Sequence, residues 1–109
     1  MFKWNHKIYM DDVVRKDPIK YRRIIERRKV TKNCYCITMP ANEMNSMDIY
    51  SSRELWFKYR RLQGLEILGL ASNKTNAIEL VQQIIDDVYK EKHDVNAETL
   101  HEFFSKSGG

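Results

Sequence analysis

Residues 65–71 constrain the fold more than any other part of the sequence. Apart from Glu66, this run is apolar on both faces of the expected strand, so the strand should be central or covered by helices. Residues 74–91 follow with apolar side chains at helical spacing, and Ser72 or Asn73 is the expected N-cap. A two-sided strand followed by a long amphipathic helix predicts an α+β domain.

Two more strands are expected upstream of this pair. Residues 34–39 are rich in Cys, Tyr, Ile and Thr, which are typical of strands. Residues 40–46 indicate a loop and residues 47–50 a short returning strand. The two strands therefore form a β-hairpin, and residues 65–71 supply the third strand of the sheet.

A crossover helix is expected between the hairpin and the third strand. Ser51 and Glu54 have the spacing of a capping box, which opens a helix to about Leu62, and Gly64 suits its C′ position. This connection returns the third strand parallel to the second. The sequence thus predicts a three-stranded sheet in the order second, first, third strand. The sheet packs against the long amphipathic helix, with further helices at both ends of the chain.

The N-terminal third is interpreted as helical. Residues 11–14 start a short helical turn, and Asp17 with Pro18 predicts a second helix that ends near Lys29. One side of this helix is expected to pack inward, through Tyr21, Ile24, Ile25 and Arg28.

Length and charge favour one domain with an uneven charge distribution. The chain has 109 residues, 42% of them hydrophobic, and no Pro-, Gly- or Ser-rich linker, which predicts a single domain over 1–109. Residues 1–32 carry a net charge of +7 and the remainder −3, so the first segment forms a basic helical flank. Asn96 caps a helix to about Phe104, and residues 105–109 form a frayed tail.

The cysteines and the hydropathy favour the cytoplasm. Two cysteines are too few for a disulfide framework. Cys34 and Cys36 alternate along a strand, so their side chains should point to one face rather than at each other. The N-terminus lacks the apolar stretch of a signal peptide, and the most apolar run, residues 64–71, is too short to span a bilayer. We therefore expect a cytoplasmic protein with no membrane segment.

Motifs that carry a known chemistry are missing. HExxH, the phosphate-binding GK[ST] loop, GxGxxG and the common serine and cysteine nucleophile motifs do not occur. His93 and Asp94 share only two letters with the metal-binding dyad of phosphohydrolases and are interpreted as a helix-end turn, and Asp86 and Asp87 as a solvated face. We expect no catalytic residue, no cofactor and no metal, and no small-molecule ligand is evident from the sequence. An enzyme would require a pocket with convergent polar groups, which a sequence does not display.

Basic surface is the strongest positive signal. The expected helix at 18–29 is strongly cationic. A second basic cluster lies in the last turn of the helix expected at 51–62. The candidate partner-binding residues are Lys20, Arg22, Arg23, Arg27, Lys58, Arg60 and Arg61. Such a surface suits an acidic protein as well as phosphates. The second cluster also lies in the last turn of its helix, where cations favour the helix dipole without any partner.

Aromatic residues leave the nucleic-acid alternative open. Trp4, Tyr9, Trp56 and Tyr59 would offer stacking platforms for a single strand. Trp56 and Tyr59 also fall on a helical stripe that suits the core. The aromatic residues therefore do not separate the two kinds of partner.

Three segments together resemble a known type of protein. They are NCYCITMPANEMNSMDIY at 33–50, SSRELW at 51–56 and YRRLQGLEILGLASNKTNAIELVQQIIDDVY at 59–89. The pattern, over residues 17–104, is similar to small uncharacterised proteins of gut Gram-positive bacteria and their mobile elements. The resemblance implies no catalytic residues. It implies small regulators and anti-defence proteins, including inhibitors of CRISPR nucleases, as candidates, although many such inhibitors are acidic and this chain is basic.

The sequence therefore favours a small cytoplasmic, non-enzymatic binding or regulatory protein that acts through protein–protein contact. The alternative is a nucleic-acid-binding accessory or anti-defence protein of a mobile element that uses the same basic helix. The open edges of the expected sheet also favour a homodimer, formed by strand addition or helix packing.

Overall fold

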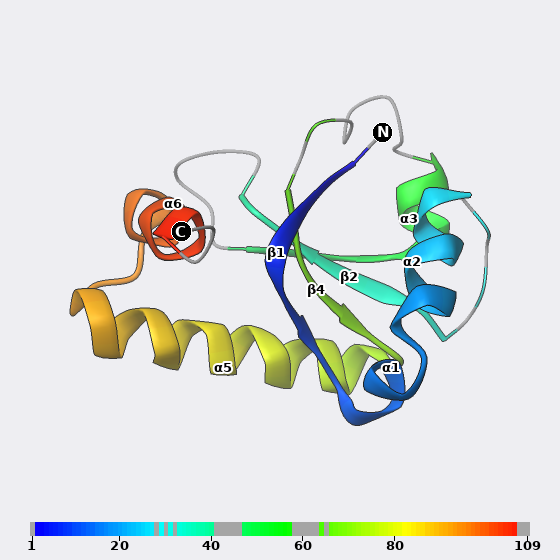
Figure 1. Ribbon diagram of the computed structural model, residues 1–109, viewed down its shortest axis with the longest axis horizontal. Coiled ribbons are helices and arrows are strands. Elements are labelled where there is room, and N and C mark those ends of the chain that lie inside the picture. The colour runs from blue at the N-terminus through cyan, green and yellow to red at the C-terminus, as the bar shows by residue number, and fades with distance from the viewer. Residues whose placement is uncertain are drawn as a thin grey trace.

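A four-stranded mixed sheet forms the centre of the protein (Figure 1). The computed structural model describes residues 2–27, 29, 31, 33–40, 47–57, 64 and 66–106. The strands are β1 (Lys3–Met10), β2 (Tyr35–Thr38), β3 (Asp48–Ser51) and β4 (Glu66–Ala71). The helices are α1 (Asp12–Lys16), α2 (Pro18–Glu26), α3 (Ser52–Phe57), α5 (Lys74–Lys92) and α6 (Ala97–Lys106).

The strand order is β1-β4-β2-β3. Strand β2 is antiparallel to both β3 and β4, so β3 and β4 run parallel to each other. This confirms the expected hairpin, the parallel return after the crossover helix and the relative order of the three expected strands. It also confirms that β4 is central, because β1 pairs with its other side.

Strand β1 corrects the expectation of a three-stranded sheet and of an entirely helical N-terminal flank. It pairs parallel with β4, but its register advances from Trp4 opposite Ile67 to Tyr9 opposite Gly69, so β1 carries an irregular bulge with three more residues than β4 has over this stretch. A bulge of this size breaks the alternation of apolar and polar side chains that marks a strand in a sequence. The basic segment is therefore partly sheet, and Phe2, Asn5 and Tyr9 are buried.

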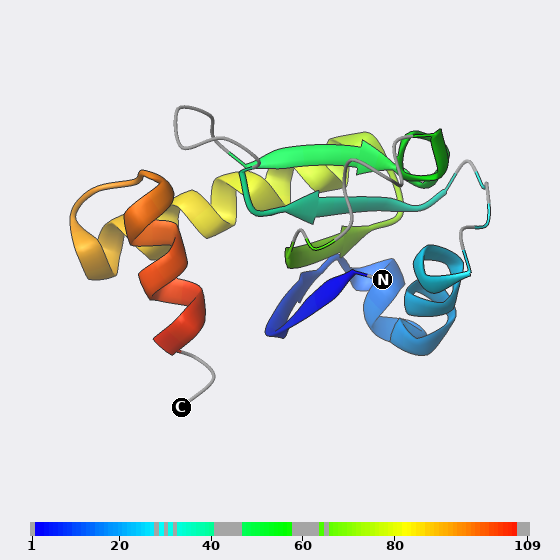
Figure 2. The same ribbon diagram turned by 90° about the horizontal axis from the view of Figure 1, so that it is seen from above.

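Each face of the sheet is covered by its own layer of helices. Strand β4 contributes Leu68 and Ala71 to a core cluster with α5 and α6, and Ile67 and Leu70 to a second cluster with α1, α2 and α3. Helices α1, α2 and α3 gather at one end of the molecule and α6 lies at the other, with α5 running between them (Figure 1 and Figure 2). The two-sided strand thus has the cover that its composition requires.

Helix boundaries largely follow the capping signals. The N-caps with a side-chain hydrogen bond to the helix are Asp11, Asp17, Ser51, Asn73 and Asn96. Ser51 and Glu54 form the reciprocal capping box, with both bonds at 3.1 Å. His93 ends α5 in the left-handed region, with φ of 62°, which confirms a helix-end turn. Helix α2 ends at Glu26, earlier than the expected Lys29.

The carboxylate of Asp11 joins the starts of two helices. Its Oδ1 accepts from the Val14 N–H at 2.8 Å, while Oδ2 accepts from the Ser72 N–H and hydroxyl at 2.7 Å and from Asn76 Nδ2 at 2.9 Å. Burial acts to raise the pKa of Asp11, but these hydrogen bonds outweigh it and lower the pKa below its ordinary value. The ionised carboxylate therefore holds α1 against the beginning of α5.

We predict that Asp11→Asn lowers the free energy of unfolding by about 2 kcal/mol, because the amide group replaces the Oδ2 acceptor with a donor. Since the folded pKa lies below the unfolded one, this stabilisation is complete above the unfolded pKa. It is lost as the pH falls through the folded value. Urea unfolding at pH 7 and pH 3 measures both effects. The control Asp12→Asn, on an exposed carboxylate 4.0 Å from Arg15, should change stability by less than about 0.5 kcal/mol. Equal losses in the two variants would contradict the assignment.

Candidate functional site

Helix α2 presents a cationic face to solvent. Asp17 caps the helix and Pro18 occupies its first turn. Together they fix where the helix begins, and the helical period then determines which side chains face the sheet. Tyr21 and Ile25 are buried against the sheet and Ile24 is half-buried, as the spacing predicts. The opposite side holds four exposed basic side chains, and we call it the α2 cationic face: Lys20, Arg22, Arg23 and Arg27.

The α2 cationic face is not neutralised by the ion pairs of the described residues. Those pairs join Arg15 to Asp12 and Lys92 to Glu102. Helix α3 packs against α2, and further exposed cations lie on the neighbouring segments: Lys16, Lys29 and Arg53. Exposed cations therefore occur from α1 to α3 around this end of the molecule, among exposed acids such as Asp12 and Glu54.

Trp4 anchors one member of the face. The Arg22 guanidinium lies 4.6 Å from the centroid of the Trp4 ring, and the Trp4 indole N–H donates to the Glu26 carboxylate. These contacts tie α2 to β1 and restrict the rotamers of Arg22. Arg23 and Arg27 lie outside this cluster and are the members of the face best suited to reach a partner.

Ile19 is an apolar residue that sequence reasoning missed. It is 62% exposed and lies one helical turn before Arg22 and Arg23. Its position in the helical period could have identified it, because Ile19 does not lie on the same side of the helix as Tyr21, Ile24 and Ile25. The α2 cationic face therefore combines an exposed aliphatic side chain with arginines.

Other expected site residues have different outcomes. Lys58, Arg60 and Arg61 lie outside the described residues, as do Arg28 and Tyr59. Tyr9 does not offer a stacking platform: its ring is buried, and its hydroxyl donates to Asp87 at 2.6 Å. Burial and this hydrogen bond raise the pKa of Tyr9, so it is a neutral structural group. Trp4 is half-buried, with Arg22 over its ring.

The two cysteines are free, buried and packed in the same core cluster. Burial raises the pKa of Cys34 to about 12, and burial likewise raises the pKa of Cys36. Thiols with such pKa values are protonated at neutral pH and are poor nucleophiles. No group of His, Cys, Asp and Glu that could hold a metal ion occurs among the described residues.

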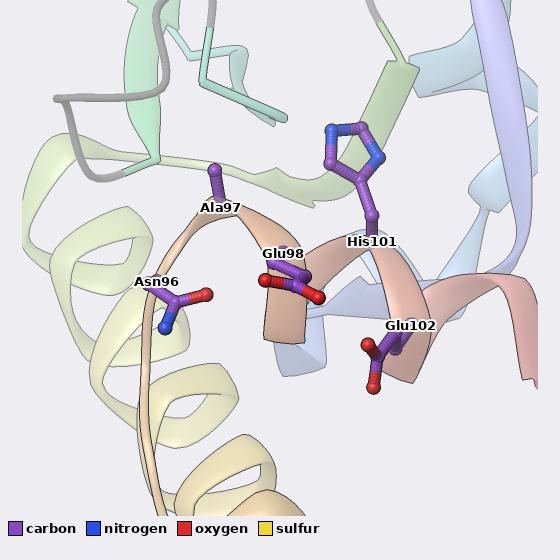
Figure 3. A pocket seen from close by; sticks show the side chains of 5 residues that line it. All are labelled: Asn96, Ala97, Glu98, His101 and Glu102. Atoms are coloured by element: carbon purple, nitrogen blue, oxygen red, sulfur yellow. The ribbon is translucent and has the colours of Figure 1, made fainter.

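A pocket of about 550 Å³ lies beside α6 (Figure 3). It is lined by Asn96, Ala97, Glu98, His101 and Glu102, which all come from α6 and its N-cap. In Figure 3 the His101 ring and the Glu102 carboxylate point in different directions, so the titratable groups do not converge. The pocket has no arrangement suited to general acid–base chemistry.

A second pocket, of about 370 Å³, lies between α1 and α5. Among its lining residues, Asp11 and Asn76 are already bonded to each other. The described pockets therefore offer no catalytic constellation, and the α2 cationic face is the surface with the clearest recognition chemistry.

Comparisons with known proteins add no identity. Neither a protein-family model, a curated protein nor a solved structure matches the chain. Within the part of the chain that the structure describes, no helix has both the length and the apolar content needed to cross a membrane.

We predict that both thiols resist Ellman's reagent in the native protein. Because Cys34 and Cys36 are buried and their pKa values are raised, labelling at pH 8 should be at least about 100-fold slower than in denaturant. Absorbance at 412 nm with and without guanidinium measures the rates. Rapid labelling of one thiol in the native protein would contradict the burial of that cysteine.

Proposed function

We propose that this protein is a small, non-enzymatic binding protein that contacts an acidic protein partner through the α2 cationic face. The free, buried cysteines support a cytoplasmic location, where thiols stay reduced. In this function the protein acts by occupying or recruiting its partner, so affinity and surface complementarity determine its effect.

The exposure of Ile19 among the arginines is the observation that carries the proposal. Protein interfaces bury apolar and arginine side chains together, and such residues contribute most of the binding free energy. An acidic surface with a small apolar depression would accept Ile19 and pair with Arg23 and Arg27. An isoleucine 62% exposed has no comparable use against a phosphate backbone.

Glu26 also favours a protein over a nucleic acid. It is exposed on α2 and accepts the Trp4 indole N–H, which fixes a negative charge beside Arg22. A carboxylate at this position would repel a phosphate, whereas a protein partner can pair it with a donor. The α2 face is therefore mixed in chemistry rather than uniformly cationic.

A second candidate function is nucleic-acid binding, including an anti-defence role in a mobile element. It is favoured by the extension of exposed cations beyond α2 to Lys16, Lys29 and Arg53. Several cations along one end of a molecule would contact successive phosphates and give a steep dependence of affinity on salt. The two functions differ in what they require of Ile19.

We predict that Arg23→Glu combined with Arg27→Glu reduces partner capture at least about tenfold without unfolding the protein, because both side chains are exposed. Arg22 is left in place because it packs on Trp4. The matched control is Lys74→Glu with Lys90→Glu on α5, which makes the same change in net charge, from +4 to 0. Capture from nuclease-treated host lysate is measured by quantitative mass spectrometry, with circular dichroism to confirm folding. Equal loss in both double variants would indicate a non-specific charge effect and contradict the proposal.

Ile19→Ala separates the two functions. A protein partner that buries Ile19 should bind the variant at least about fivefold more weakly, whereas a nucleic acid should not distinguish it. The second measurement is fluorescence anisotropy with labelled single- and double-stranded DNA over a salt series. Tight DNA binding that weakens steeply with salt and is unchanged by Ile19→Ala would contradict the protein-binding proposal and support nucleic-acid binding.

A further inference from the structure

The two edges of the sheet are not equivalent. At one edge, β1 is bulged, and Lys3 and Lys7 are exposed along it. The bulge is filled by Asn5, whose Nδ2 donates to the Glu66 carboxylate and, at 3.3 Å, to the Phe104 carbonyl oxygen of α6. Bulges, lysines and a covering helix are the features that prevent an edge from pairing with another strand.

The opposite edge, β3, is regular. All its residues pair with β2 without a register shift, and its side chains are half-buried. No strand among the described residues lies on its outer side. Within the described part of the chain, this edge therefore has neither the bulge nor the lysines that β1 has.

The ladder shows which backbone groups of β3 face outward. The Ser52 N–H donates to the Cys34 carbonyl oxygen at 3.0 Å, so residues of the same parity, Asp48 and Tyr50, direct their N–H and C=O groups at β2. Ile49 and Ser51 alternate with them and direct these groups away from β2. The Ser51 N–H already donates to Glu54 Oε1 at 3.1 Å. Among the described residues, Ile49 is thus the strand residue that offers both a donor and an acceptor at the outer edge.

An apolar stripe on α5 meets this edge at the N-terminal end of the helix (Figure 2). Ile78 and Tyr89 are 53% and 57% exposed, and Val81 and Ile85 between them are half-buried. Ile49, Val81 and Ile85 pack on the same core cluster, so the stripe and the Ile49 side chain belong to the same face of the sheet. Strand β3 lies at the top of Figure 2, and the N-terminal end of α5 reaches the same edge of the molecule.

We propose that a second copy of this chain pairs with this edge, β3 against β3 and antiparallel, with Ile49 on the two-fold axis. In this register the two Ile49 residues exchange both N–H···O=C bonds, as the central pair of an isologous interface does. Asp48 then lies opposite Tyr50 of the second copy, so the like charges of the two Asp48 residues are kept apart.

A register centred on Tyr50 would pair Ile49 with Ser51 on both sides of the axis. It would therefore need the Ser51 N–H, which Glu54 occupies, in each central pair. The register centred on Ile49 needs that N–H only in the outer pairs, between Ser51 and Met47.

A stable dimer needs more buried surface than β3 alone provides, and the apolar stripe on α5 can supply part of it. Two strands of four residues bury far less than the roughly 800 Å² per subunit of a specific interface. A two-fold axis along the sheet normal places the two α5 helices side by side on the same face of a continuous sheet. Ile78, near the N-terminal end of α5, is then covered together with the strand edge (Figure 2). A second copy of the chain would thus cover both the outward backbone groups of β3 and the exposed apolar surface of α5.

The test is the mass of the protein in solution. Sedimentation equilibrium over about 1–200 µM should give twice the 13.1 kDa of one chain at the upper concentrations. Ile78→Lys places a charge in the interface from an exposed position and should raise the dimer dissociation constant at least about tenfold. Ile49→Pro removes the outward N–H but none that bonds to β2, and should have the same effect.

The matched control is Val13→Lys on α1, at the other face of the sheet. Val13 is 46% exposed, close to the exposure of Ile78, and this change should leave the dissociation constant within about twofold. A wild-type protein that stays monomeric at about 200 µM overturns the proposal, and capture of a foreign peptide by that monomer would assign β3 to another occupant. A dimer that tolerates both Ile78→Lys and Ile49→Pro, or that Val13→Lys dissociates, also overturns it. Loss of α2 function leaves the prediction unaffected, because the two surfaces lie on opposite faces.

Discussion

Burial of β4 on both faces is the constraint on which the rest of the structure depends. The strand contributes to both core clusters and pairs on both edges, so helices are needed above and below the sheet. Gly69 lies at the centre of this arrangement, where a Cβ atom would approach the Tyr9 carbonyl oxygen to 3.2 Å and Ile37 Cδ1 to 3.0 Å. The missing side chain allows three strands to approach closely at this position.

The same central strand separates two surfaces of different chemistry. On one side, α2 is anchored by Tyr21 and Ile25 and carries arginines around Ile19. On the other side, α5 covers the sheet and leaves an apolar stripe beside β3. Since a sheet with helices lies between them, the two surfaces can contact different molecules at once. A dimer through β3 would present two α2 cationic faces to a partner, and binding would then gain from avidity.

Buried polar contacts determine how the ends of the chain attach to this core. Asn5 joins the β1 bulge to Glu66 and to the last turns of α6, and Tyr9 bonds to Asp87 on α5. These groups lie far apart in the sequence, and each would be costly to bury without its partner. They therefore specify one position for β1 and α6 among the many that apolar packing alone would accept.

Local signals in the sequence determined most of the elements. The apolar runs identified β2, β3 and β4, while Asp17, the Ser51–Glu54 capping box, Asn73 and Asn96 marked the helix starts, because capping depends on residues within one turn. The sequence also placed Lys20, Arg22, Arg23 and Arg27 on an exposed face, since the helical period separates them from Tyr21 and Ile25.

Only the tertiary structure decided the features that depend on distant residues. Strand β1 is held by parallel pairing with β4 and by the Asn5 contacts, and its bulge removes the alternation by which a strand is recognised. The stacking of Arg22 on Trp4 and the contrast between the β1 and β3 edges likewise arise between segments that the sequence keeps apart. Composition and periodicity describe a segment by itself, whereas these features are set by what packs beside it.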